Sequence, residues 1–600
     1  MGDSSAVLND SGCIKSGGVT TISGPYVSPE QTESFPLKHH IYERHKRISW
    51  RCHFCSETDE NGGSLRVIIT CFFTLTLAVA IALAAQIHFG DYQFTPHGSV
   101  ATDSIECSTI GTDILKKGGN AVDAAVAATL CLGVVNLHVT GLGGGGFLIV
   151  YDHRKKKVLD VIDFRETAPS SLSESLLTSS EGLKAGLLVG VPGLLRGLGL
   201  VHSTHGKLAW SEVVHPSARI ARNGFPVPTS LISSNIHINP QLNETFRLQN
   251  FLKNIEAGGN LTLPKLADSF EMIAANGPDV LYNGQLANAV LSAVEAAGGV
   301  MKKEDLETYQ PKRRKALHSV FGSFNIIVPD SPSGGPFLLE TLRKLDNNKT
   351  VGNFTEMIQA LTAAMQETYR TQFNSFGDTP DNTSDHGLLS STALWSYPEA
   401  VGSHVAAVDL NDLYVSIVSG LNTWFGSQLL TKEGFVLNNA MENFNAGSNA
   451  FAPGKRPFSL ATPIIAVQKE VCGRRLISGV GDAVVGIQLL VEYITREKNI
   501  SASMEAPRFR YNPVENQIQY EAWHKPEMSN KTLHQLRLLN YKKHIANPVP
   551  HQNYRIVQPN ATCHHPIFSG MVTKDRAWRI PKIIILYFTI CARLMCLVIY

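Results

Sequence analysis

The sequence predicts a mixed α/β fold in which two layers of strands lie between two layers of helices, an αββα sandwich, preceded by a transmembrane helix. Apolar, β-branched runs at Val405–Leu410, Leu413–Ser419 and Thr462–Gln468 are typical of buried strands. Gly111–Asn136 begins with a helical pattern and continues rich in alanine, which favours tightly packed helices. Strand layers flanked by helix layers are one of the few stable architectures for a single large core, and they suggest this sandwich.

Length and composition fit one large globular unit behind an N-terminal tail. The chain has 600 residues, and 43% of them are hydrophobic, which is ample for a large core. The formal net charge is only +2, so we expect no nucleic-acid partner.

One apolar run predicts the transmembrane helix. Val67–Phe89 contains no Asp, Glu, Lys or Arg. At a rise of about 1.5 Å per residue, a helix of this length spans the roughly 30 Å hydrocarbon core of a bilayer. A cleaved signal peptide would be shorter and nearer the N-terminus. A buried core helix would be expected to have a polar face, and this run has none.

Charges beside the run predict its orientation. The residues before it include the basic side chains Lys38, Arg44, Lys46, Arg47, Arg51 and Arg66, and Asp91 follows it. Positive charge stays on the cytoplasmic side, so residues 1–66 are expected inside the cell, with 1–37 disordered and 38–66 basic. We therefore expect a single-pass type II membrane protein with an extracellular or luminal ectodomain.

Glycosylation sequons agree with that topology. Beyond the run, N-x-S/T occurs at Asn243, Asn260, Asn348, Asn353, Asn382, Asn499, Asn530 and Asn560. Such a dense set favours an ectodomain that passes through the secretory route. The sequon at Asn9 lies on the expected cytoplasmic side and should remain unmodified.

The cysteines divide by compartment. Cys107 and Cys131 lie in the ectodomain, 24 positions apart, and can form a disulfide in an oxidising lumen. Cys472 and Cys563 either pair or stay free. Cys52 and Cys55 lack a second pair of zinc ligands, so palmitoylation beside the membrane is a better interpretation than zinc.

The glycine run at Gly141–Gly146 leads into an apolar strand at Phe147–Asp152. A phosphate-binding loop would precede a helix and carry Lys followed by Ser or Thr, so that interpretation is rejected. Glycines placed here indicate a close approach of backbone segments, which only a residue without a side chain permits.

The remaining elements follow in chain order. We expect a long helical middle at 191–369 containing one strand at 320–328, a polar linker at 375–401, a further strand at 435–439 and a helix at 484–496. The apolar run at 583–600 is either an aberrant or alternative C-terminus or a second membrane anchor.

Several motifs together resemble the gamma-glutamyltransferase, or glutathione hydrolase, family. They are GGNAVDAA (118–125), GLGGGGFL (141–148), DFRETAP (163–169), VPGLLRGL (191–198), HGKLAW (205–210), the segment 402–427 and PGKRPFS (453–459). The resemblance covers about Ala101 to Tyr554 and looks most like the glutathione hydrolase 7 branch. It implies an N-terminal-nucleophile hydrolase fold and no metal or organic cofactor.

The resemblance also divides the chain. Together with the hydropathy pattern it gives a tail at 1–66, a membrane helix at 67–89, a large-subunit-like region at 91–401, a small-subunit-like region at 402–572 and an atypical hydrophobic C-terminus at 573–600. Family members move the gamma-glutamyl group of glutathione to a threonine nucleophile and then to water or an amino acid. Arg165 matches the arginine that grips the glutamyl carboxylate, and Asn422 and Ser459 match two further substrate contacts.

The position of the nucleophile is where the sequence departs furthest from the family. Gly402 stands where the resemblance requires the threonine that becomes the new N-terminus after self-cleavage. Glycine has no side chain with which to attack a carbonyl. Ser403 is the candidate replacement, but a shift of one residue along a strand turns the side chain to the opposite face unless a bulge corrects it.

Other family positions are also changed. Ala440 and Asn443 replace the acidic pair that binds the substrate ammonium, and Glu442 matches a neighbouring position. Leu460 replaces the second of two serines. Asp482 and Ala483 replace the glycines of the oxyanion hole, whose loss typically costs about 3 kcal/mol of transition-state stabilisation.

Two classes of function follow. One is a weak glutathione hydrolase or gamma-glutamyltransferase that uses Ser403 and divides into two chains on self-cleavage. The other is an uncleaved pseudoenzyme, a membrane-anchored ectodomain that binds glutathione, another gamma-glutamyl compound or a protein partner, or that regulates an active relative. Fold alone does not decide between them.

Overall fold

The computed structural model describes residues 63–89 and 98–570, with gaps at 178–183, 239–245, 254, 257, 349–353, 373–374, 379–400, 445–446, 470–472, 507, 513–516, 522–541, 547–556 and 563–564. The expected tail before residue 63, most of the linker and the C-terminus at 573–600 lie outside the described residues. The chain forms two compact units, Met1–Gln93 and Phe94–Tyr600.

The described residues of the first unit form helix α1 (Gly63–Phe89), which includes the whole apolar run. Among the helices of the described residues, none meets the length and apolarity required to cross a membrane. The membrane span therefore stays a prediction from the sequence.

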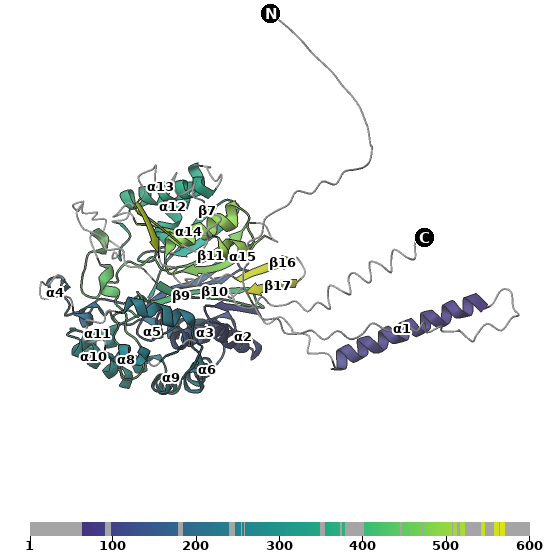
Figure 1. Ribbon diagram of the computed structural model, residues 1–600, viewed down its shortest axis with the longest axis horizontal. Coiled ribbons are helices and arrows are strands. Elements are labelled where there is room, and N and C mark those ends of the chain that lie inside the picture. Colours follow the sequence, from purple (N-terminus) through teal and green to yellow (C-terminus); the bar gives the residue numbers. More distant parts are fainter. Residues whose placement is uncertain are drawn as a thin grey trace, which may run out of the picture. The chain divides into compact units, whose positions relative to one another are not determined.

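Two six-stranded sheets form the centre of the second unit (Figure 1). The first has the order β1 (Gly98–Thr102), β9 (Val401–Asp409), β10 (Leu413–Asn422), β2 (Gly145–Asp152), β3 (Lys157–Asp163) and β6 (Lys312–Arg313). The second has the order β17 (His565–Gly570), β16 (Val557–Thr562), β12 (Arg475–Val480), β11 (Thr462–Gln468), β8 (Phe324–Pro329) and β7 (Ala316–Phe321). Smaller sheets contain β13 (Phe509–Asn512), β14 (Gln517–Glu521) and β15 (Lys542–Ala546), and β4 (Phe225–Pro226) with β5 (Asn260–Leu261).

Helices cover the outer face of each large sheet (Figure 1). The layer on the first sheet comprises α2 (Ile105–Lys116), α3 (Ala121–Val135), α5 (Leu194–His205), α6 (Trp210–Asn223), α9 (Pro264–Asn276) and α10 (Gln285–Ala296). The layer on the second comprises α12 (Gly335–Asn348), α13 (Phe354–Gln372), α14 (Ala483–Leu490) and α15 (Ile500–Glu505). Shorter helices are α4 (Glu174–Leu177), α7 (Thr229–Ser233), α8 (Phe246–Lys253) and α11 (Lys303–Thr308).

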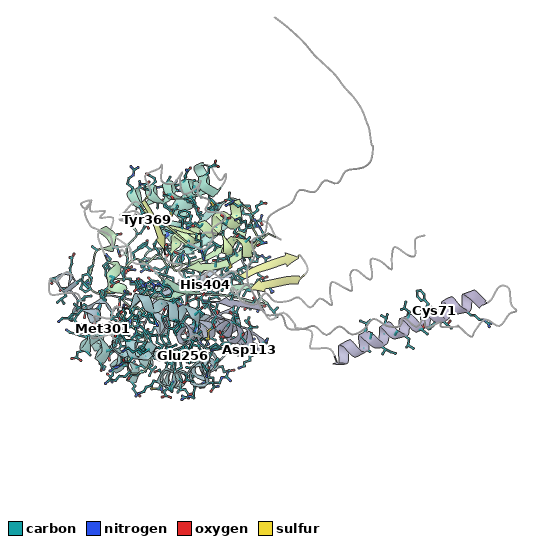
Figure 2. The ribbon with its side chains drawn as sticks, viewed as in Figure 1. Cys71, Asp113, Glu256, Met301, Tyr369 and His404 are labelled. Carbon is teal, nitrogen blue, oxygen red and sulfur yellow. A yellow bond between two sulfur atoms is a disulfide. The ribbon has the colours of Figure 1, made fainter. Side chains whose placement is uncertain are left out.

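Side-chain alternation explains how the two sheets share a core. Ala406 and Val408 of β9 pack between the sheets with Ile465 of β11. Val405 and Ala407, on the other face of β9, pack against the helix layer that contains α3. Figure 2 shows His404 in the interior, between the layers. The mixed α/β fold is confirmed, with its layers in the expected order.

Helix α3 is buried along its whole length, as its small residues predict. Asn120 accepts hydrogen bonds from the first turn, and the Asp123 carboxylate accepts one from the Asn120 backbone, which completes a capping box. A disulfide joins Cys107 of α2 to Cys131 of α3, so this predicted bridge is confirmed.

The expectations for individual elements require corrections. The single strand expected at 320–328 is a hairpin of β7 and β8, because Gly322 adopts a positive φ of 56° and turns the chain between them. The strand expected at 435–439 is wrong, since Val436 and Leu437 form only isolated bridges. The helix expected at 484–496 changes to a π-helix at Val491–Thr495.

The glycine run packs against neighbouring backbone, as expected. A side chain on Gly143 would collide with the Val436 carbonyl, and one on Gly146 would collide with the Val418 carbonyl of β10. The run leads into strand β2 rather than a helix. These glycines therefore bring β2 and β10 together beside the candidate site.

Candidate active site

The site lies where β9 begins and β10 ends. Gly402 is the second residue of β9, and Asn422 is the last residue of β10. A side chain beginning at Gly402 would lie 3.1 Å from Cα of Gly481 and 3.3 Å from Cγ1 of Val418. These distances are tighter than ordinary van der Waals contact. A side chain at position 402 would therefore require its neighbours, including the backbone that follows β12, to shift by a few tenths of an ångström.

Ser403 lies on the opposite face of β9 from Gly402. It shares a face with Val401 and Val405, which pack in the core beneath the helices, and it pairs with Ser419 of β10. Its side chain is buried, and Oγ has no hydrogen-bond partner among the described residues. The register shift in this strand pair falls on β10, between Ser419 and Asn422, so it does not turn Ser403 over.

The peptide bond before Gly402 lies inside the sheet. Val401 is buried, pairs with Asn422 and belongs to the core beneath the helices. At the other end of the linker, Asp378 is held by Arg314 at 2.6 Å and by Lys312 at 3.4 Å. Burial acts to raise the pKa of Asp378, but these cations hold it below its usual value. Asp378 and Val401, the described residues on either side of 379–400, are therefore both held in place by contacts of the fold.

Arg165 follows strand β3 and lies in the protein interior. Its Nη1 contacts Oε2 of Glu166 at 2.6 Å, and the side chains of this ion pair are 4% and 0% exposed. Nη2 donates to Oδ1 of Asn422 at 3.2 Å, and Nε donates to the carbonyl of Pro457 at 3.3 Å. Three of the five guanidinium N–H groups are thus used, which leaves two for a carboxylate.

Glu166 is a partner that the sequence reasoning did not identify. Burial raises the pKa of its carboxyl group, although Arg165 opposes this effect. Oε1 of Glu166 has no hydrogen-bond partner among the described residues. The only sequence signal was its place beside Arg165 in the DFRETAP motif.

A second buried charge cluster supports this region. Asp163 contacts Arg314 at 2.8 Å and Arg456 at 2.9 Å, and its Oδ1 accepts a hydrogen bond from the Arg165 backbone. Asp163 and Arg456 are almost completely buried. The cluster fixes the backbone that carries Arg165.

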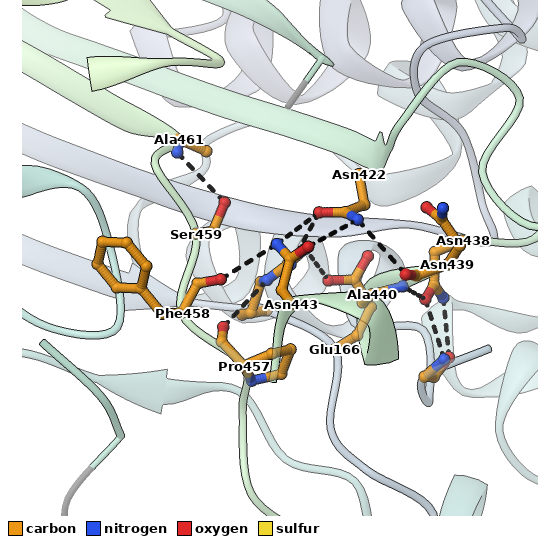
Figure 3. Close-up of polar contacts among 12 residues, drawn as sticks. Glu166, Asn422, Asn438, Asn439, Ala440, Asn443, Pro457, Phe458, Ser459 and Ala461 are labelled. Carbon is orange, nitrogen blue, oxygen red and sulfur yellow. Dashed lines mark hydrogen bonds and ion pairs between the residues drawn. The ribbon is translucent and has the colours of Figure 1, made fainter. Parts of the chain in front are cut away.

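Asn422 pairs with Asn443 through both side-chain amides (Figure 3). Nδ2 of Asn443 donates to Oδ1 of Asn422 at 2.7 Å, and Nδ2 of Asn422 donates back at 3.0 Å. Asn422 has a positive φ of 85°, which asparagine tolerates better than most residues. The structure therefore brings Arg165, Asn422 and Asn443 together, with a neutral amide where the family resemblance requires an acid.

Ser459 lies on the other side of this group (Figure 3). Its Oγ accepts from the backbone N–H of Ala461 at 3.2 Å, so its own proton remains available to a ligand. The next residue, Leu460, is buried in the core of the second sheet. Asn443 joins the two sides by donating to the Phe458 carbonyl at 3.1 Å.

Glu442 is the acidic side chain nearest to the replaced pair in sequence. Its Oε2 accepts from Nδ2 of Asn439 at 2.7 Å, and Asn439 also accepts a hydrogen bond from Asn422 through its carbonyl. Burial raises the pKa of Glu442 to about 7. Ala440 is buried and carries no charge.

The residues at the oxyanion position begin a helix. Asp482 is the N-cap of α14, and its carboxylate accepts from the Val484 backbone at 2.9 Å. Ala483 is the first residue of that helix and is completely buried. The carboxylate therefore lies where the positive end of a helix would otherwise face an oxyanion.

Among the predicted glycosylation sites, Asn260 and Asn499 are described and exposed. Asn499 caps α15 through its side-chain oxygen, which leaves its nitrogen free. The side chains of Asn243, Asn348, Asn353, Asn382, Asn530 and Asn560 lie outside the described set. No group of three or more His, Cys, Asp or Glu side chains suited to a metal ion occurs in the described part of the chain.

Comparison with known proteins gives one consistent result. A family model described as gamma-glutamyltranspeptidase matches residues 107–397 and 390–559. Glutathione hydrolase 7 of Rattus norvegicus is 33% identical over 509 residues, which cover 76% of this chain and 76% of that protein. Glutathione hydrolase 2 of Arabidopsis thaliana is 30% identical over 481 residues, which cover 71% of this chain and 82% of that protein. The structure of cephalosporin acylase from Bacillus halodurans shares the fold, with a TM-score of 0.66 and 20% identity over 80% of this chain and 96% of that one.

Proposed function

Because this chain belongs to the gamma-glutamyltranspeptidase family, we propose that it is an uncleaved, non-catalytic member whose ectodomain binds a gamma-glutamyl compound without turnover. One observation carries the proposal. Gly402 occupies the position of the nucleophile and packs against Gly481, while Ser403 shares the opposite face of β9 with Val401 and Val405. An acyl transfer that proceeds through a covalent intermediate requires a nucleophile at this point.

The family supports the choice of ligand. The relatives' names specify glutathione hydrolysis, and the family resemblance drawn from the sequence motifs agrees with the matched family and branch. Arg165 keeps two free N–H groups and Ser459 keeps its hydroxyl proton, which suits a carboxylate. Because the Glu166 carboxylate already neutralises the charge of Arg165, we expect the site to bind the carboxylate of a gamma-glutamyl compound only weakly.

Changes at two other positions of the site also support a loss of catalytic activity. Asn443 forms an amide pair with Asn422 in place of a carboxylate for the substrate ammonium. The Asp482 carboxylate occupies the start of α14, where it would repel a developing oxyanion. Each of these substituted residues forms hydrogen bonds within the fold. Restoring the family residue at one position alone should therefore not restore the reaction.

We predict that the mature protein is a single chain. After removal of glycans, the natural chain and a Gly402→Thr variant should each give one full-length mass by intact mass spectrometry. The natural chain has no nucleophile at 402, and in the variant the new side chain is crowded by Gly481 at 3.1 Å while the Asp482 carboxylate remains at the oxyanion position. A Gly402→Ala variant provides the matched control for crowding without a hydroxyl group.

Two fragments would contradict this prediction. A fragment beginning at Ser403 would favour the alternative, a weak glutathione hydrolase that uses Ser403 and consists of two chains. Calorimetry with glutathione tests the ligand separately: heat that weakens in Ser459→Ala, which leaves the buried Arg165–Glu166 pair intact, supports binding, and no heat at millimolar glutathione overturns it.

We also propose that α1 anchors the protein as a type II membrane protein with an extracellular or luminal ectodomain. The uncharged run from Val67 to Phe89 and the exposed Phe72 and Phe73 support a membrane anchor, and the basic flank before the run supports this orientation. We predict that Asn260 and Asn499 carry glycans and that Asn9 does not, as measured by glycosidase treatment and peptide mass spectrometry. A glycan on Asn9 would show that the orientation is the opposite of the one proposed.

A further inference from the structure

A pocket of about 530 Å³ shares no lining residue with the candidate active site. Its lining comes from α8, α10 and the turn at 429–433, and its apolar residues include Ala289, Ala293 and Leu430. The volume lies within the range of roughly 300–1,000 Å³ typical of small-molecule sites.

The charged side chains of this pocket have no partners in the described part of the chain. Arg247 and Lys432 are exposed at its edge and form no ion pair there. Glu433 also lines it, and Oε2 of Glu433 is shielded from solvent without a hydrogen-bond donor among the described residues. A shielded carboxylate oxygen without a donor is unfavourable, so a ligand that supplies one would be stabilised.

A second pocket of similar size, about 550 Å³, shows the contrasting case. There Arg196 is bound by Asp279 and by three carbonyl oxygens. Arg313 is bound by Asp160 and by the Thr204 hydroxyl. The arginines of that pocket are already paired within the protein, whereas Arg247 and Lys432 of the α8–α10 pocket form no ion pair with the described residues.

We propose that the α8–α10 pocket binds a small zwitterion of the amino-acid or dipeptide class. The carboxylate of the ligand contacts Arg247 and Lys432, its ammonium contacts Glu433, and short apolar side chains pack on the alanines of α10. A dianion is disfavoured by Glu433, and a simple cation is disfavoured by the two basic residues. A dipeptide extends over roughly 7 Å, which fits a pocket of this volume. The inference does not depend on the proposed function.

The test is calorimetric titration of the full-length protein in detergent with the dipeptide alanyl-alanine. We expect saturable binding that weakens about tenfold when the C-terminus of the dipeptide is amidated, and about tenfold in the double variant Arg247→Gln, Lys432→Gln. In that variant the free and amidated dipeptides should bind equally. Glu433→Gln should remove the preference for the free over the N-acetylated dipeptide.

A charge-matched control is Lys155→Gln with Lys116→Gln, two exposed lysines that do not line the pocket. This control should leave dipeptide binding unchanged. The proposal is overturned if no saturable binding occurs, if the double variant binds both dipeptides as the natural protein does, or if an acidic peptide binds tightly regardless of N-acetylation. The last result would identify a basic docking surface for acidic peptides instead.

Discussion

Replacing Arg165 with methionine is expected to lower the free energy of unfolding by about 3–5 kcal/mol, because it leaves a buried carboxylate without its cation. Glu166 is completely buried, and Arg165 at 2.6 Å is its ion-pair partner in the described structure. Oε1 of Glu166 already has no hydrogen-bond partner among the described residues, so the rest of the site does not compensate. Chemical denaturation of the purified natural and variant proteins measures the difference.

The loss should depend on pH in a defined direction. Burial already raises the pKa of Glu166 above 4.5 while Arg165 opposes it, so removing Arg165 raises this pKa further. The folded variant then binds a proton more tightly than the unfolded chain does, and stability falls as the pH rises above the ordinary glutamate pKa. The variant should therefore recover stability in acid.

A double variant and an exposed ion pair test whether the loss of stability comes from burying an unpaired charge. The double variant Arg165→Met, Glu166→Leu should recover most of the loss, because two apolar side chains replace the pair together. Arg370 and Glu367 also lie 2.6 Å apart, but their side chains are 76% and 42% exposed. Arg370→Met should cost less than about 1 kcal/mol. Equal losses at both positions would contradict the account of the buried pair.

Much of the fold could be predicted from local pattern. The run at 462–468 coincides with β11, and Leu413–Ser419 falls inside β10, because buried β-branched residues have few other stable arrangements. The hairpin at 316–329 was missed since a single glycine-serine turn interrupts an otherwise continuous apolar run. The segment at 435–439 is apolar yet pairs only through bridges, a result of tertiary packing that the pattern does not contain.

The site was only partly predictable, because its contacts join distant parts of the chain. Arg165 was recognised from its motif, but its contacts with Asn422 and Pro457 cross more than 250 positions. The amide pair of Asn422 and Asn443 follows from the course of the chain beyond β10. The register argument against Ser403 needed only the strand period of two, and its packing with Val401 and Val405 agrees with it.

The residues that replace the family's catalytic and binding residues have structural roles in this protein. Asp482 caps a helix, Leu460 fills the core of the second sheet, and Asn443 bridges Asn422 to the Phe458 carbonyl. Each of these three substituted residues is accommodated by local contacts of the fold, which supports the proposal that the site no longer catalyses the family reaction.

Glu442→Gln is expected to stabilise the protein by about 3 kcal/mol at pH 8 and to have little effect near pH 5. Burial raises the pKa of Glu442 from 4.5 to about 7 in the folded protein. The folded state therefore holds the proton more tightly than the unfolded state, and the natural protein loses stability as the pH rises from about 4.5 to about 7. Glutamine keeps a carbonyl oxygen to accept the hydrogen bond from Asn439 and does not titrate.

The same carboxylate links stability to ligand binding. An ammonium group held beside Glu442 would lower its pKa, so a gamma-glutamyl compound should stabilise the natural protein more at pH 8 than Glu442→Gln. Glu256→Gln is the control, since Glu256 is an exposed side chain of the helical region (Figure 2). Thermal denaturation between pH 5 and pH 8, with and without glutathione, measures both effects. Parallel pH profiles for the natural protein and Glu442→Gln would show that Glu442 ionises at little cost in the folded protein, and equal stabilisation of both proteins by glutathione at pH 8 would show that Glu442 does not contact the amine of the ligand.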